Sequence, residues 1–205
     1  MGKLKKFLFG EESLRQTMFK NSFWLTVSNT GSSLIKAIIV IYAARLLGAE
    51  QYGLFSYAIS IAATFTILSE SGLNYLIALH MVRRDGEHPA YFPTLVFLRM
   101  GLVITVIGLT IAIGPLIMKF PEAKVLIPLV ALLVASDDIR GLLSGVARAE
   151  NRMDKEAFGA ILTNILIVVF GLAGLYYSHT SFALTLAYLA GSVFGTLSLF
   201  FVVRE

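Results

Sequence analysis

Six long apolar stretches follow one another along the chain, separated by short polar connections. None of them alternates between apolar and polar positions as a membrane strand would, so the pattern predicts helices. Each stretch reaches the length of about 20 residues that a helix needs to cross a bilayer. The predicted spans lie at 22–47, 53–79, 92–118, 125–148, 157–178 and 182–203. Two Gly-x-x-x-Gly pairs, Gly141 with Gly145 and Gly191 with Gly195, are spaced for close helix packing.

The residues before the first stretch form a separate segment, 1–21, in which lysine and arginine are interleaved with leucine and phenylalanine. This composition is typical of an amphipathic segment lying on an anionic membrane surface. The apolar stretch that follows is too long for a signal peptide and lacks a cleavage site of small residues, so it stays as a membrane span. We therefore predict two regions, the amphipathic segment 1–21 and a six-helix transmembrane lobe over 22–205.

The composition supports a bilayer location. Apolar residues make up 57% of the 205 residues and charged residues 15%, against roughly 25% charged in an average soluble domain. The surface of a soluble fold could not accommodate so much apolar area, whereas lipid accepts it directly. We expect an all-α, multi-pass protein of the cell (inner or cytoplasmic) membrane, with no separate soluble domain.

The connections on the two sides of the predicted bundle differ in charge. The more basic side carries Lys3, Lys5, Lys6, Arg15, Lys20, Arg83, Arg84, Arg148, Arg152, Lys155 and Arg204. The loops on the other side carry Lys119 and Lys124. The positive-inside rule then places both termini in the cytoplasm. The formal charge of +4 is therefore a topology signal, and no nucleic-acid partner is predicted.

Polar residues interrupt three of the six predicted spans, and within each span they share one helix face. This follows from a rotation of about 100° per residue, which also turns Asp138 about 100° away from its neighbour Asp137. The residues in these stripes include Asn29 and Lys36 in the first span, Glu70 and Asn74 in the second, and Asp137 and Arg140 in the fourth. Ionisable groups at this depth usually face a bundle interior or a water-filled cavity.

A structural interpretation pairs these charges with one another. The candidate pairs are Lys36 with Asp137, Glu70 with Arg99, and Asp137 with Arg140. For Arg99, which stands alone in an apolar helix, snorkelling of the side chain to the membrane interface is the favoured interpretation.

A functional interpretation makes the same groups part of a hydrated cavity. Lys36, Arg45 and Arg140 are then the candidates for binding an anionic substrate. The chain has no cysteine, no metal-ligand spacing, no ATP-binding loop and no nucleophile elbow, so neither a metal nor a cofactor is predicted. The loops are too short to build an active site, and the sequence favours moving a substrate over transforming one.

Three segments carry a resemblance to a known family. They are AARLLGAEQYGLFSYA (Ala43–Ala58), SGLNYLIALHMVRR (Ser71–Arg84) and GLLSGVARAENRM (Gly141–Met153). They resemble the polysaccharide flippases of the multidrug/oligosaccharidyl-lipid/polysaccharide exporter superfamily, and the similarity covers essentially the whole chain. The resemblance implies one of two six-helix lobes around a central cavity, which moves undecaprenyl-pyrophosphate-linked oligosaccharide to the outer leaflet by alternating access.

The same resemblance implies partners and leaves alternatives open. The implied partners are the lipid-linked oligosaccharide, membrane lipids, a second six-helix lobe (a missing C-terminal half or another copy), a glycan polymerase and glycosyltransferases. A carboxyl group among Glu70, Asp137 and Asp138 is a candidate for ion coupling. A drug or metabolite antiporter of the same superfamily would favour an acidic cavity. A non-transporting scaffold subunit of a glycan-assembly complex would have sealed packing and every buried charge paired.

Overall fold

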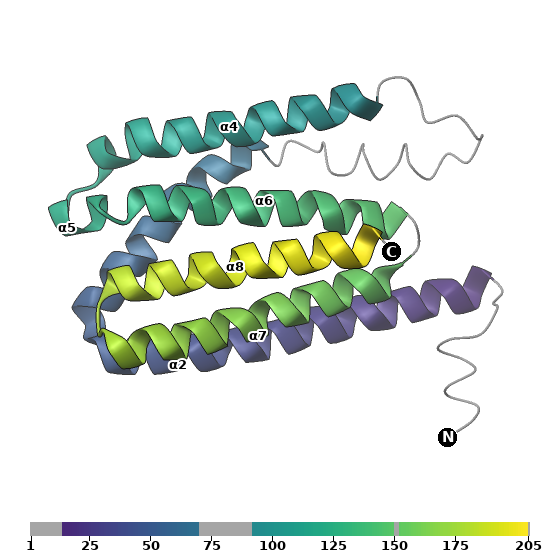
Figure 1. Ribbon diagram of the computed structural model, residues 1–205, viewed down its shortest axis with the longest axis horizontal. Coiled ribbons are helices and arrows are strands. Elements are labelled where there is room, and N and C mark those ends of the chain that lie inside the picture. Colours follow the sequence, from purple (N-terminus) through teal and green to yellow (C-terminus); the bar gives the residue numbers. More distant parts are fainter. Residues whose placement is uncertain (1–13, 70–91, 150–151, 205) are drawn as a thin grey trace.

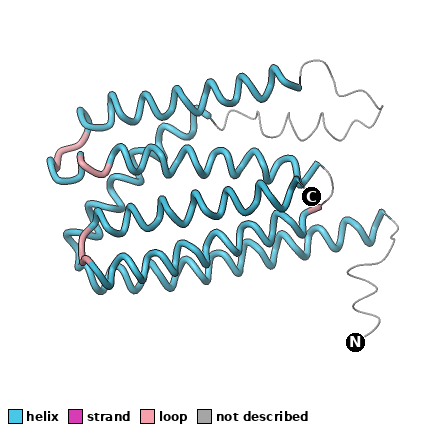
Figure 2. The backbone as a smooth tube through the Cα atoms, viewed as in Figure 1, coloured by secondary structure: helices cyan, strands magenta, loops and turns pink. Residues whose placement is uncertain are grey.

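The computed structural model describes residues 14–69, 92–149 and 152–204, and it folds them into helices that lie side by side (Figure 1). Short loops and turns at 118–120, 125–126 and 178–180 separate neighbouring helices, and the described residues contain no strand (Figure 2). Four described segments are long and apolar enough to cross a membrane: Phe19–Ile67, Phe97–Ile117, Met153–Tyr177 and Ser181–Arg204. The prediction of an all-helical membrane protein is confirmed at this level.

The first helix, α2 (Leu14–Ser69), is 56 residues long and has two arms that meet at Gly48. Gly48 has a φ of 73°, in the left-handed region that glycine enters without the cost of a Cβ. The first arm runs along α7 and the second crosses behind the bundle toward α4 (Figure 1). The predicted spans 22–47 and 53–79 therefore correspond to the two arms, although residues 70–79 lie outside the described part. Residues 14–21 of the predicted amphipathic segment continue the same helix.

The remaining helices are α4 (Phe92–Ile117), α5 (Pro121–Lys124), α6 (Ile127–Ala149), α7 (Met153–Tyr177) and α8 (Ser181–Arg204). The predicted spans for α4, α6 and α8 end within two residues of these bounds, and α7 begins four residues earlier than predicted. The sequence pattern does not predict the short α5. This helix begins where Pro121 occupies the first helical turn and Phe120 before it is extended, as the residue before a proline prefers.

Close packing of α7 against α8 depends on one of the two glycine pairs. A Cβ at Gly191 would lie 2.7 Å from the backbone of Ile167, and a Cβ at Gly195 would overlap the Thr163 side chain. Only glycine lets the two backbones come this close. The predicted packing role is therefore confirmed for Gly191 and Gly195. A Cβ at Gly145 would meet no neighbouring atom within 4 Å, so that glycine is not at a close approach.

One end of the bundle collects most of the described basic residues near helix termini. The start of α2 and the end of α8 lie at this end, where α6 also ends and α7 begins (Figure 1). It therefore carries Lys20, Arg148, Arg152, Lys155 and Arg204. Arg148 and Glu156 form a two-bond ion pair that ties α6 to α7 there, with a distance of 2.7 Å from the Arg148 Nε to the Glu156 Oε2. The Gly48 bend and α5 lie at the opposite end.

Candidate functional site

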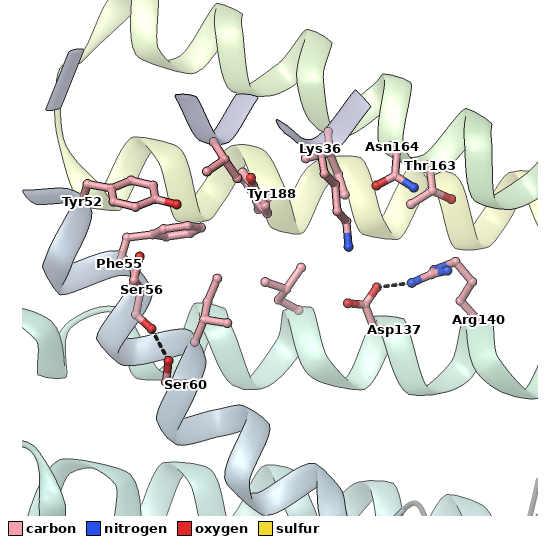
Figure 3. Close-up of a pocket in the computed structure, with 14 residues that line it drawn as sticks. Lys36, Tyr52, Phe55, Ser56, Ser60, Asp137, Arg140, Thr163, Asn164 and Tyr188 are labelled. Atoms are coloured by element: carbon pink, nitrogen blue, oxygen red, sulfur yellow. Dashed lines mark hydrogen bonds and ion pairs between the residues drawn. The ribbon is translucent and has the colours of Figure 1, made fainter. Parts of the chain in front are cut away.

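A cavity of about 350 Å³ lies between both arms of α2 and the helices α6, α7 and α8 (Figure 3). It has two chemically different ends. The charged end is formed by Lys36 on α2, Asp137 and Arg140 on α6, and Thr163 and Asn164 on α7. The opposite end is lined by aromatic rings from α2 and α8.

Lys36 reaches the cavity from the first arm of α2, and its ammonium points across toward α6 (Figure 3). Within residues 14–69, 92–149 and 152–204 it takes part in no ion pair. Asp137, on the facing helix, is instead paired with Arg140, with 3.0 Å between the Arg140 Nη2 and the Asp137 Oδ1. The predicted pairing of Asp137 with Arg140 is therefore present, and that of Lys36 with Asp137 is not. The cavity brings these three predicted candidates together.

Asp137 is also held from α8. The Ser192 hydroxyl lies 2.9 Å from the Asp137 Oδ1 and 3.1 Å from the Ser136 Oγ, and Ser136 lies 3.1 Å from the Thr196 Oγ1. Each hydroxyl has one proton, so when Ser192 donates to the carboxylate, Ser136 donates to Ser192. Ser192 is fully buried. This chain of hydroxyl groups therefore holds the Asp137 carboxylate from the buried side, where α8 packs against α6. The sequence pattern does not predict it, although Ser192 and Thr196 directly follow the packing glycines of α8.

Arg99 belongs to a different place in the molecule. Its side chain is 1% exposed, and its Nη2 lies 2.9 Å from the Asp138 Oδ1. The predicted snorkelling of Arg99 is therefore wrong: a carboxylate on α6 pairs with the guanidinium inside the bundle, so the side chain does not have to reach the interface. Asp138 points toward α4, away from the cavity, as the helical rotation predicted. Glu70, the predicted partner of Arg99, lies outside the described residues, as does Asn74.

Two further candidates lie on α2 but do not line the cavity. Asn29 is exposed two turns before Lys36, and its backbone carbonyl accepts a hydrogen bond of 2.8 Å from the Ser33 Oγ. Arg45 is exposed three residues before Gly48, near the bend. Neither residue is brought together with Lys36, Asp137 and Arg140, and their role in substrate binding stays a prediction.

The aromatic end of the cavity is formed by Tyr52 and Phe55 on the second arm of α2 and by Tyr188 on α8. The Phe55 ring centroid lies 5.0 Å from that of Tyr188 and 6.0 Å from that of Tyr52. Phe55 is buried, and the two tyrosines are half-buried. The sequence alone does not single out these residues. An aromatic residue that faces lipid and one that lines a cavity occur in the same apolar sequence pattern.

Comparison with known proteins identifies one family. The model of the family described as "Polysaccharide biosynthesis protein" matches residues 18–205. The match includes every residue that lines the cavity. No curated protein and no solved structure matches the chain.

Proposed function

We propose a transport function for this chain, which belongs to the polysaccharide biosynthesis protein family. In this proposal the chain forms one lobe of a flippase. The flippase carries undecaprenyl-pyrophosphate-linked oligosaccharide from the cytoplasmic to the outer leaflet of the cell membrane by alternating access. Its sugars and diphosphate occupy the cavity, while the polyprenyl tail stays in lipid.

The observation that carries the proposal is the ammonium of Lys36 in the cavity, for which the described residues offer no ion-pair partner. The charge of Arg140 is offset by Asp137, so Lys36 gives the charged end of the cavity a positive excess. A cation at bilayer depth is costly unless it has a counter-charge. The diphosphate of a lipid-linked sugar supplies that counter-charge and leaves when the substrate is released.

The proposal includes a second lobe that covers the open face of the cavity. Lys36 and Asp137 are exposed on the surface of this lobe, although each lies near the middle of its helix. Charged groups in that position are unfavourable in contact with lipid tails. A second six-helix lobe, supplied by a longer chain or by another copy, would cover this face and complete the cavity.

The proposed topology has six crossings with both termini in the cytoplasm. At 1.5 Å per residue, the 49-residue apolar segment of α2 would be about 74 Å long if straight, more than twice the thickness of a bilayer core. The bend at Gly48 lets each arm cross once. The basic end of the bundle then faces the cytoplasm, where glycosyltransferases make the substrate, and a glycan polymerase would take it up outside.

The two alternatives are less well supported. An antiporter for cationic compounds would favour an acidic cavity, but the described lining carries Lys36 and Arg140 against Asp137. A scaffold subunit would have sealed packing, whereas the described helices leave an open cavity of about 350 Å³ between them.

The test is the distribution of lipid-linked oligosaccharide between the leaflets after the gene is deleted. We expect the oligosaccharide to accumulate on the cytoplasmic leaflet. The wild-type gene should restore export and Lys36→Met should not, while Lys119→Met, at the other end of the bundle and exposed, serves as the matched control. Unchanged outward translocation in the deletion strain would contradict the proposal.

A further inference from the structure

The two ends of the cavity differ in charge as well as in composition. Lys36, Asp137 and Arg140 gather at one end, and Tyr52, Phe55 and Tyr188 at the other (Figure 3). Ser56, which lies beside Phe55, is uncharged (Figure 3). A ligand that fills the cavity therefore meets a cationic region and a neutral aromatic region.

The distance between the two regions follows from the register of α8. Tyr188 lies at the aromatic end, and Ser192, four residues later, holds Asp137 at the charged end. Residues four apart lie on the same face of a helix, separated by about 6 Å along its axis. The two regions are thus neighbours along the cavity. A diphosphate and the sugar bonded to it are neighbours in the same way.

The aromatic end has the chemistry that recognises a carbohydrate. Neither the Tyr52 nor the Tyr188 hydroxyl bonds to another of the described residues, although both side chains line the cavity. Tyrosine offers an apolar ring face together with a polar hydroxyl. A pyranose ring presents C–H groups on its faces and hydroxyls at its rim. It can therefore pack against the tyrosine ring and also form a hydrogen bond with the tyrosine hydroxyl. A few such polar groups in a mostly apolar pocket are what fixes the orientation of a ligand.

We propose that Tyr52, Phe55 and Tyr188 form a subsite for the first sugar of the lipid-linked substrate, a neutral hexose or N-acetylhexosamine. The diphosphate then lies at Lys36 and Arg140. This inference rests on the proposed function. It also gives the substrate a direction: the sugar lies nearer to the Gly48 bend, and the diphosphate lies nearer to the basic end of the bundle. With the basic end in the cytoplasm, the sugar leads outward.

The test compares two lipids that differ in the sugar alone. The full chain is placed in nanodiscs, and the affinities of undecaprenyl diphosphate and undecaprenyl diphosphate N-acetylglucosamine are measured. We expect Tyr188→Leu to weaken binding of the sugar-bearing lipid by about tenfold, because a ring contact and a hydrogen bond are lost. Binding of the bare diphosphate lipid should not change. Lys36→Met should weaken binding of both lipids.

Controls separate the subsite from the fold and from the proposed function. Tyr176→Leu, at an 80% exposed tyrosine on α7 outside the cavity, should leave both affinities unchanged. Tyr188→Phe keeps the ring, so it tests the hydroxyl even where Tyr188→Leu fails to fold, and a smaller, sugar-selective loss is expected. Equal losses for both lipids, or no loss for either, would overturn the sugar subsite and leave the transport proposal in place. Failure of the wild-type chain to bind either lipid would overturn both.

Discussion

Asp137 and Asp138 are neighbours in the sequence and have opposite environments. The Asp138 side chain is 9% exposed and is bonded to the buried Arg99 between α6 and α4. The Asp137 side chain is 47% exposed and lines the cavity with Lys36 and Arg140. A rotation of about 100° between successive residues separates the two. The comparison teaches that charges at the same depth of a membrane helix can hold the bundle together on one face and line an open cavity on the other.

The largest effect is expected from matched substitutions of the two carboxylates. Asp138→Asn removes the carboxylate of the buried ion pair between α4 and α6, and loss of one member of a buried pair costs about 3–5 kcal/mol. Asp137→Asn should cost less than about 1 kcal/mol, since that carboxylate is half exposed. The free energy of unfolding in detergent measures both. Equal losses of stability in the two variants would show that both carboxylates hold the bundle together to the same extent, which would contradict the comparison.

A smaller effect tests the close packing of α8 against α7, which places Ser192 beside Asp137. Gly191→Ala would push a methyl group against the Ile167 backbone and separate α8 from α7, so we expect a loss of about 1–3 kcal/mol. Gly145→Ala is the matched control, because its methyl group meets no atom within 4 Å. It should be neutral or slightly stabilising, as glycine is a poor helix former. The same unfolding measurement decides, and a neutral Gly191→Ala would contradict the packing described.

Lys36→Met should affect function and not stability. The side chain is exposed and has no ion pair among the described residues, so the free energy of unfolding should change by less than about 0.5 kcal/mol. A charge-assisted contact to a diphosphate is worth about 1.5–3 kcal/mol, so translocation of the lipid-linked substrate should fall roughly tenfold or more. Translocation is measured in proteoliposomes. A destabilised variant, or one with a normal rate, would show that Lys36 acts structurally or not at all.

The smallest effect concerns the support of Asp137 by Ser192. Ser192→Ala removes one hydrogen bond to a carboxylate that keeps Arg140, so we expect a loss of about 1 kcal/mol in stability. Ser198→Ala, whose hydroxyl bonds to the carbonyl of Phe194 in the same helix, is the control and should change little. Ser192→Thr keeps a hydroxyl group at this position. If its stability exceeds that of Ser192→Ala, the loss in the alanine variant is due to the missing hydroxyl and not to the size of the side chain.

Much of this architecture is predictable because it depends on distances along one chain. The length of each apolar stretch gives the helices, and the rotation per residue gives the separation of Asp137 from Asp138. Asp138, to which Arg99 is bonded, is 39 positions away on another helix, so in the sequence this arginine looks isolated and suited to snorkelling. The hydroxyl chain through Ser192 is equally hidden, since small polar residues also serve simple packing. Gly48 lies in a segment expected to be a loop, but only Gly48 itself is non-helical, and the residues on both sides of it are helical.

The central claim is that the Asp137 face of the bundle is wet and binds a lipid diphosphate, while the Asp138 face is sealed. The chain has no cysteine, so single cysteines can report on each face. The most direct measurement is the rate at which a charged, water-soluble thiol reagent modifies Ser56→Cys in the cavity and Val106→Cys, 2% exposed on α4. We predict rapid modification of Ser56→Cys that undecaprenyl diphosphate N-acetylglucosamine slows, and no modification of Val106→Cys. Equal rates at the two positions, or a rate at Ser56→Cys that the lipid does not change, would contradict the account.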